Sequence, residues 1–313
     1  MNKINLNKKL CPLCEAEANE NNIVDIVENI WENNKNVYEC SNCKLYFIDE
    51  PSQSEIEFLY NSDFYARNNN IIYKFIDAKM KYARALNRFN YIKKFIKKTD
   101  NLNVLEIGAS DGLLLSIFKK ENFNVFGYEL NENARKDALK KYDIKMKDDF
   151  LKDKNIDKNK YNIVIMSHIL EHFTNPKYIL NSVHNFIRGG GGVNDILFIE
   201  IPYTPNYKIV SKDDMKIFFE TEHTVHFNEK NISLLMKECN FKILDICYNE
   251  YNINDNNLKK NIWLGKFDFK SSINFLYFIS KICFNPKNAF IDYKISDNFN
   301  FGRNIRIIAA KNN

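Results

Sequence analysis

Residues 103–115 read N-V-L-E-I-G-A-S-D-G-L-L-L, and this stretch decides the fold. An apolar run from residue 104 to residue 107 ends at Gly108, and a helical apolar pattern begins at Leu113. A strand that turns into a helix at a glycine places backbone N–H groups and the positive end of the helix at the carboxyl edge of a sheet. Open α/β sheets bind nucleotide ligands at this edge. The stretch therefore predicts a ligand-binding βα turn.

Acidic and small residues in this turn indicate the charge of the ligand. Glu106 places a carboxylate beside the turn, where it would repel a bound anion and hold an ammonium group. Gly108, Ser110 and Gly112 follow at every second position, and no Lys-Ser/Thr pair comes after them. The pattern favours a nucleoside without a phosphate chain. A glycine turn alone is a weak signal, because any doubly wound fold can contain one.

Later strand ends add further candidates for ligand binding. A second strand, 123–130, brings Glu129 to the same edge about 20 residues after the turn, where a carboxylate would accept ribose hydroxyls. Dinucleotide-binding proteins share that acid. A short strand near Ile144 leads to Asp149, which predicts either an adenine contact or a polar turn. The strand at 161–166 then runs into S-H-I-L-E-H, which the dinucleotide enzymes lack.

Strands and helices alternate from Val104 onward. Helices are predicted at 111–120, 133–141 and 176–187, and a fifth strand at 196–203. This order predicts an α/β fold, a Rossmann-like, mostly parallel sheet with right-handed crossovers. A final strand, 305–310, is expected to pair antiparallel at the sheet edge.

The chain is expected to divide into four parts. Residues 1–52 would form a zinc ribbon, and 53–100 a helical connector on the substrate side, with a short helix opened by Ser54 and Glu57. The catalytic sheet would occupy 101–248, and 249–313 a C-terminal extension.

Two cysteine pairs predict the ribbon. Cys11-Pro-Leu-Cys14 and Cys40-Ser-Asn-Cys43 each bring two thiolates within reach of one ion, and together they complete an all-sulfur tetrahedral site. Such a zinc ion would be structural, because protein ligands fill all four positions. The alternatives are ordinary cysteines or redox-active pairs.

The composition of the chain narrows the classes of partner and the cellular locations that can be expected. The net charge of +5 is mild, and the tightest lysine cluster, within 93–98, has the spacing of a solvated helix face, so a nucleic-acid partner is not expected. No apolar run approaches the roughly 18 residues that a membrane span requires. Seven cysteines, an odd number with four in C-x-x-C pairs, favour a reducing, cytoplasmic location. The oligomeric state stays open.

Taken together, these motifs resemble those of class I S-adenosylmethionine-dependent methyltransferases, and in particular the zinc-containing sugar methyltransferases known for deoxysugar C-methylation. The resemblance covers about residues 10 to 247. It is carried by the cysteine pairs, E-I-G-A-S-D-G-L-L-L, H-I-L-E-H, the E-I-P of strand five, and E-H-T-V-H-F at 222–227.

The resemblance implies a role for each candidate residue. The cofactor S-adenosylmethionine would be held by Glu106, Gly108, Ser110, Gly112, Glu129, Asp149 and His168. His223 would be the general base, with Glu222 beside it and Tyr65 as a hydroxyl on the substrate side. Histidine suits this role, because its pKa lies near neutrality.

The resemblance implies a sugar substrate, in nucleotide-linked form, used in glycan or metabolite biosynthesis. The acceptor atom, carbon or oxygen, stays open. His226 stands where the C-methyltransferases carry an aromatic residue, and the segment after Leu244 is too short for their additional C-terminal domain. Two alternatives remain: an RNA base methyltransferase with an RNA-binding ribbon, and a non-catalytic ribbon module with a degenerate sheet.

Overall fold

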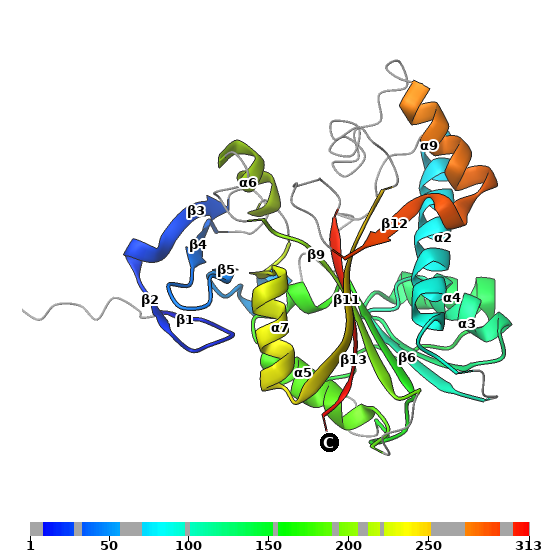
Figure 1. The fold of residues 1–313 in the computed structure, drawn as a ribbon, viewed down its shortest axis with the longest axis horizontal. Helices are drawn as coiled ribbons and strands as arrows, with labels where there is room; N and C mark the ends of the chain where they lie inside the picture. The colour runs from blue at the N-terminus through cyan, green and yellow to red at the C-terminus, as the bar shows by residue number, and fades with distance from the viewer. Residues whose placement is uncertain are drawn as a thin grey trace, which may run out of the picture.

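The computed structural model describes residues 9–27, 33–56, 71–97, 101–152, 156–189, 194–205, 212–219, 222–251, 273–294 and 303–312. A large twisted sheet with helices on both faces forms its centre, and a small β-rich unit lies to one side (Figure 1).

The central sheet has seven strands in the order β12-β11-β13-β9-β8-β6-β7. Their bounds are β6 Asn103–Ile107, β7 Asn124–Tyr128, β8 Ile163–Ser167, β9 Ile196–Pro202, β11 Phe241–Tyr251, β12 Phe290–Tyr293 and β13 Asn304–Lys311. β7, β6, β8 and β9 pair in parallel, and β13, β11 and β12 continue the sheet antiparallel. The predicted Rossmann-like fold class is confirmed.

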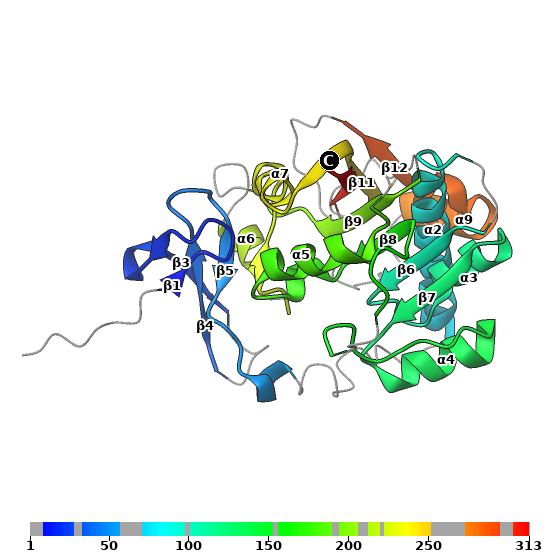
Figure 2. The ribbon, with the colours of Figure 1, turned by 90° about the horizontal axis from the view of Figure 1, so that it is seen from below.

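Helices cover both faces of this sheet (Figures 1 and 2). The helices of the chain are α2 Ile71–Lys93, α3 Leu113–Lys120, α4 Glu132–Tyr142, α5 Pro176–Phe186, α6 Lys212–Phe219, α7 Glu229–Glu238 and α9 Ile273–Phe284, with 3-10 turns η1 Glu20–Asn22, η3 Leu170–His172 and η4 Pro286–Asn288. Of these, α6 packs on the small β-rich unit instead of the central sheet.

Successive residues of a central strand pack into two different cores, one on each face of the sheet, because side chains alternate between the faces. In β6, Leu105 and Ile107 pack toward α5 and α7, whereas Val104 packs toward α2 and α3. Glu106 lies two residues after Val104 in the strand, so its side chain points to the same face of the sheet, the face that α2 covers.

Two strands differ from their predictions. The strand expected near Ile144 is reduced to one bridge, between Lys147 and Tyr128. Ile144 and Met146 instead fill the core on the α2 face, where Met146 lies over Gly127. The predicted strand at 305–310 forms as β13, but it lies inside the sheet between β9 and β11; β12 is the antiparallel edge.

The small unit contains a hairpin and a second sheet. The hairpin joins β1 Lys9–Leu10 and β2 Glu17–Ala18, and the sheet has the order β10-β5-β4-β3. The strands of this sheet are β3 Ile23–Val27, β4 Lys35–Glu39, β5 Tyr46–Ile48 and β10 Val225–His226. β10 comes from the distant 222–227 segment, so the ribbon and the sheet domain share a strand pairing.

The helical turn after the ribbon is capped two residues earlier than predicted. The Ser52 N–H donates to the Glu55 carboxylate at 2.7 Å, and the Glu55 N–H donates to Ser52 Oγ at 3.2 Å. This reciprocal pair is a capping box, and it replaces the predicted Ser54–Glu57 pair. Glu57 lies outside the described residues, as does Tyr65.

Within the described ranges, no helix combines the length and apolar character that crossing a membrane requires.

A buried charge network ties α2 to the sheet. Glu200, at the end of β9, is 1% exposed and accepts hydrogen bonds from Arg88 of α2, with Nε–Oε1 2.7 Å, and from Nε of Arg306 in β13. Arg306 also donates to Asn87 at 2.6 Å and to Asp292 at 3.0 Å. Although burial alone would raise the pKa of Glu200, the two guanidinium groups lower it well below its usual value. Glu200 is therefore an anion inside the fold.

Arg306→Met should destabilise the protein by about 3 kcal/mol or more, because it leaves the buried carboxylate of Glu200 and the half-buried carboxylate of Asp292 with too little positive charge. The free energy of unfolding would be measured by urea denaturation. Lys136→Met is the matched control: it also removes a cation from an ion pair, with Glu132 at 2.7 Å, but on an exposed helix face. The control should change stability by less than about 0.5 kcal/mol. Equal losses in the two variants would contradict a special role for the buried network.

Candidate active site

The glycine turn after β6 adopts the conformation that its sequence requires. Gly108 and Gly112 have φ of +74° and +75°, in the left-handed region. A Cβ on Gly108 would lie 3.0 Å from Ile169 Cδ1, and one on Gly112 would lie 2.9 Å from Ala138 Cβ. Both positions therefore need glycine for backbone conformation and for space. The Gly108 contact also brings the turn directly against the segment that follows β8.

Glu129, which follows the neighbouring strand β7, contacts this turn through its carboxylate. Its Oε2 accepts a hydrogen bond from the Ser110 N–H at 2.8 Å, and its Oε1 accepts one from the Asn131 N–H at 2.8 Å. The Gly108 N–H donates to the Tyr128 carbonyl at 2.9 Å. The structure thus brings together the glycine turn and the acid that the sequence predicted at the same edge.

Glu106 is buried, and its Oε2 has no hydrogen-bond partner. Burial, against the opposing effect of Arg88 and with a smaller contribution from the carboxylates of Asp111 and Glu129, raises the pKa of this carboxyl to about 8. A buried, unpaired carboxyl at the carboxyl edge of β6 can hold a cationic group of a ligand, and a cation there would favour its ionised form.

Asp149 lies two residues beyond Lys147, whose backbone bridges to the end of β7. Its Oδ1 accepts a hydrogen bond from the Leu151 N–H at 2.9 Å, and its side chain is half-buried. Asp149 therefore stands at the same sheet edge as Glu129 within a local turn, and a contact with adenine remains a prediction.

His168 follows β8 in the left-handed region, with φ of +53°, an uncommon conformation for a residue with a side chain. Its N–H donates to the Glu200 carbonyl at 2.8 Å, which fixes this conformation. The ring lies between two carboxylates, with Nε2 3.2 Å from Glu200 Oε1 and Nδ1 3.5 Å from Glu171 Oε1. Burial opposes ionisation of the ring, but these two carboxylates outweigh it and raise the pKa of His168.

His223 reaches the same edge from a different part of the chain. Its Nε2 lies 3.9 Å from Glu171 Oε1, and its ring meets that of His172 edge to face with centroids 5.0 Å apart. The Glu171 carbonyl accepts hydrogen bonds from the Thr224 N–H at 2.9 Å and from Thr224 Oγ1 at 3.2 Å. These contacts place the predicted base beside the segment that follows β8, and Glu222 precedes it as a half-buried residue.

The protonation state of His223 follows from its surroundings. Burial, followed by the neighbouring imidazoles of His172, His226 and His168, holds the pKa of His223 well below its usual value. The imidazole is therefore neutral near pH 7. It can bind a metal ion or accept a proton, but it is a weaker base than the histidine of near-neutral pKa that the sequence predicts.

His226 has a structural role. It pairs with Tyr46 as part of β10, and its ring meets Phe219 edge to face with centroids 5.1 Å apart. Burial lowers its pKa to about 3. A neutral, buried imidazole fills the position as an aromatic ring would.

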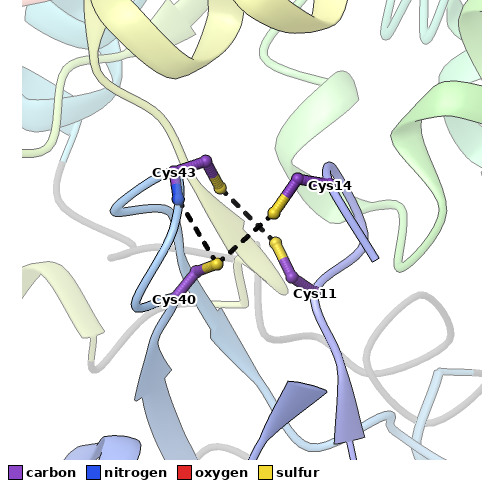
Figure 3. A group of neighbouring side chains, drawn as sticks. All are labelled: Cys11, Cys14, Cys40 and Cys43. Carbon is purple, nitrogen blue, oxygen red and sulfur yellow. Dashed lines mark hydrogen bonds between the residues drawn. The ribbon is translucent and has the colours of Figure 1, made fainter. Parts of the chain in front are cut away.

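The four predicted cysteines converge (Figure 3). Cys11 Sγ lies 3.5 Å from Cys43 Sγ, Cys14 Sγ lies 3.5 Å from Cys40 Sγ, and all four sulfur atoms lie within 4.8 Å of one another. Tetrahedral zinc thiolate sites separate their sulfur atoms by about 3.8 Å, given Zn–S bonds of about 2.3 Å. The side-chain hydrogen bond with Cys43 lowers the pKa of Cys11 to about 5, so one thiolate is favoured even without a metal ion.

Both knuckles use the same turn. The Glu15 N–H donates to the Cys11 carbonyl at 2.9 Å, and the Lys44 N–H donates to the Cys40 carbonyl at 3.0 Å. Glu15 and Lys44 each adopt a positive φ, 59° and 61°. The two C-x-x-C pairs are therefore equivalent halves of one cluster, which can hold a metal ion.

Three important residues escaped the sequence analysis. Arg88 and Arg306 surround Glu200, and Glu171 lies between His168 and His223. The sequence does contain a signal for Arg306. It is an arginine within the apolar strand 305–310, and a buried arginine needs an anionic partner. Arg88 has no such signal, because its helix carries many other basic residues.

Comparisons with known proteins agree with this geometry. The family model described as "Methyltransferase domain" matches residues 76–246, more than half of the 313 residues. No curated protein matches the sequence.

Several solved structures are similar to this chain. A Bacillus halodurans protein described as a methyltransferase is 15% identical, with a TM-score of 0.47, over 72% of this chain and 98% of its own. An Archaeoglobus fulgidus SAM-dependent methyltransferase is 18% identical, with a TM-score of 0.48, over 73% and 94%. The geranyl diphosphate C-methyltransferase of Streptomyces coelicolor is 13% identical, with a TM-score of 0.48, over 74% and 80%.

These structural likenesses are too distant to indicate an acceptor. The family model covers the glycine turn, the segment after β8 and the histidine segment at 222–227. On that match, the chain belongs to the methyltransferase-domain family and is a class I S-adenosylmethionine-dependent methyltransferase.

Proposed function

We propose that this methyltransferase acts on a sugar, in nucleotide-linked form, in glycan or metabolite biosynthesis, with His223 as the general base. The observation that carries the proposal is the pairing of β10 with β5, with His226 opposite Tyr46 and Val225 opposite Phe47. It joins the four-cysteine ribbon to the strand that begins two residues after His223. The cysteine pairs and the histidine segment are the two features that resemble the zinc-containing sugar methyltransferases, and here they form one unit.

The cofactor would lie along the edge formed by β6, β7 and β8. Gly108 and Gly112 allow close approach to the backbone, Glu129 offers carboxylate oxygens to a ribose, and Glu106 offers a carboxyl to a cation. Ser110, Asp149 and His168 complete the proposed set. S-adenosylmethionine supplies an electrophilic methyl group on a sulfonium sulfur.

The protein must then position the acceptor and remove its proton. Nε2 of neutral His223 would accept this proton. The acceptor's electron pair would take the methyl group that the cofactor supplies, and the methyl–sulfur bond would break to leave a neutral thioether. Glu171, 3.9 Å away, would stabilise the imidazolium that results. Glu222 is proposed as its neighbour in the site, and Tyr65 as a hydroxyl on the substrate side.

The cysteine cluster is proposed to hold a structural zinc ion. Four sulfur donors within 4.8 Å of one another fit zinc, and would leave it no open position for a substrate. All seven cysteines are free thiols, which fits a reducing, cytoplasmic location.

The acceptor class would be tested with purified full-length protein, S-adenosylmethionine carrying a labelled methyl group, and a panel of nucleotide-linked hexoses and deoxysugars. We expect label to enter at least one sugar. Transfer RNA and ribosomal RNA are the comparison, because a ribbon beside a methyltransferase sheet can also serve RNA binding. Transfer to RNA without transfer to any sugar would reject the sugar proposal.

His223→Gln should lower kcat by about a hundredfold or more, because glutamine cannot accept the acceptor's proton. Calorimetry should show little change in S-adenosylmethionine affinity. His184→Gln is the matched control, since His184 is also partly buried but packs on Phe241, away from this edge. A His223 variant with wild-type kcat on the identified acceptor would rule out the base assignment.

Glu106 should release a proton when S-adenosylmethionine binds. With a pKa of about 8 in the free protein, the carboxyl is mostly protonated at pH 7. A bound cation stabilises its charged form and lowers that pKa, so a proton leaves. Calorimetry at pH 7 in buffers of different ionisation enthalpy should detect the release.

Two controls accompany this measurement. Glu106→Gln should abolish the release and weaken binding, whereas 5′-methylthioadenosine, which carries no cation, should bind to the wild type without it. Equal proton release from the wild type and Glu106→Gln would show that another group titrates.

A further inference from the structure

We propose that Glu171, His172 and His223 form a second metal site, separate from the cysteine cluster, for one divalent transition-metal cation. One ligand atom from each of the three residues lies within 4.8 Å of the others. Two imidazoles and one carboxylate leave further coordination positions open, so such a site can also bind oxygen atoms of a substrate.

The strongest evidence is the carboxylate of Glu171. The residue is 1% exposed, and neither of its two oxygens has a hydrogen-bond partner. The imidazole nitrogens that approach Oε1, of His168 at 3.5 Å and of His223 at 3.9 Å, lie beyond a good hydrogen bond. Within the described residues this carboxylate has a loose ion pair with His168 but no hydrogen bond, and burying a charge that is incompletely paired is costly. A cation at this position would satisfy the carboxylate.

The backbone holds the three ligands in place before any cation binds. Glu171 and His172 belong to the 3-10 turn η3, which is closed by the His172 N–H donating to the Ile169 carbonyl at 3.2 Å. Thr224 joins the His223 segment to η3 through its two hydrogen bonds to the Glu171 carbonyl. Because the scaffold is fixed, small side-chain rotations are enough to form the site.

The size of the required movement is modest. Ligand atoms around a metal at about 2.1 Å lie about 3.0 to 3.4 Å apart. The 3.9 Å between His223 Nε2 and Glu171 Oε1 must therefore shorten by about half an ångström to one ångström. His168, whose Nδ1 lies 3.5 Å from the same Glu171 oxygen, would help to orient the carboxylate, as residues that support metal ligands commonly do.

The donor set indicates the class of metal. Two imidazole nitrogens and one carboxylate oxygen suit manganese, iron or zinc in the divalent state, whereas magnesium and calcium prefer oxygen donors. The cysteine cluster offers sulfur donors, which are softer than nitrogen and oxygen donors and select zinc. Mn²⁺ is therefore a selective probe, because it has little affinity for thiolate sites.

The role of this cation, unlike its binding, rests on the proposed transfer of a methyl group to a sugar, and it would replace the direct role of His223 as the base. A cation bound by His223 occupies the Nε2 lone pair that would otherwise accept the acceptor's proton. It would instead bind a sugar hydroxyl and lower the pKa of that hydroxyl, so that the proton passes to water. His223 would then assist deprotonation through the metal ion, and oxygen would be favoured over carbon as the acceptor atom.

The test is a titration of the zinc-loaded, full-length protein with Mn²⁺, without acceptor, following free Mn²⁺ by electron paramagnetic resonance. We expect one Mn²⁺ per chain, with affinity at least tenfold weaker in His172→Ala and unchanged in the matched control His184→Ala. His172 is the chosen ligand because it has no part in the base mechanism. One zinc per chain in each variant would show that the cysteine cluster is intact.

A second measurement needs no variant. Pulsed resonance of the Mn²⁺-loaded wild type should show coupling to imidazole nitrogen. Absence of that coupling, absence of binding, or equal affinity in wild type and His172→Ala would each overturn the metal site. Methylation of a sugar without Mn²⁺ binding would reject the metal site and leave the proposed function standing. Mn²⁺ binding without transfer to any sugar would support the metal site and reject the proposed function.

Discussion

The buried carboxylate of Glu200, held between the guanidinium groups of Arg88 and Arg306, is the interaction on which the rest of the structure depends. Arg88 belongs to the helix that precedes the sheet, Glu200 to its last parallel strand and Arg306 to the antiparallel strand beside it. One ion pair network therefore joins three segments that are far apart in the sequence. The same carboxylate lies 3.2 Å from His168 Nε2, so the network also fixes a residue of the site.

Much of the sheet domain could be predicted because its signals are local. The glycine turn needs left-handed backbone at Gly108 and Gly112, and Glu129 follows at the distance that a βα unit sets. The cysteine cluster was predictable for a similar reason, since each C-x-x-C pair forms a complete local turn. The observed positions of these residues match the predicted fold, while their roles in binding stay predictions.

Other features depend on contacts between distant segments, which periodicity does not reveal. Ile144 and Met146 have the composition of a strand, but they pack into the core on the α2 face and leave only Lys147 to pair. The apolar run at 305–310 predicts a strand, but not that it lies between β9 and β11. Glu171 looked like one residue of a motif, and only the structure shows that it is buried between histidines from two segments.

The place of β10 in the ribbon sheet affects how far this chain can be shortened. The ribbon resembles a separable module at one end of the sequence, and β13 resembles a tail at the other. Yet β5 supplies the backbone partner of β10, and β13 joins the two halves of the central sheet. Trimming either end would expose an unpaired strand edge close to the histidines, so no compact catalytic core can be excised from the interior of this polypeptide.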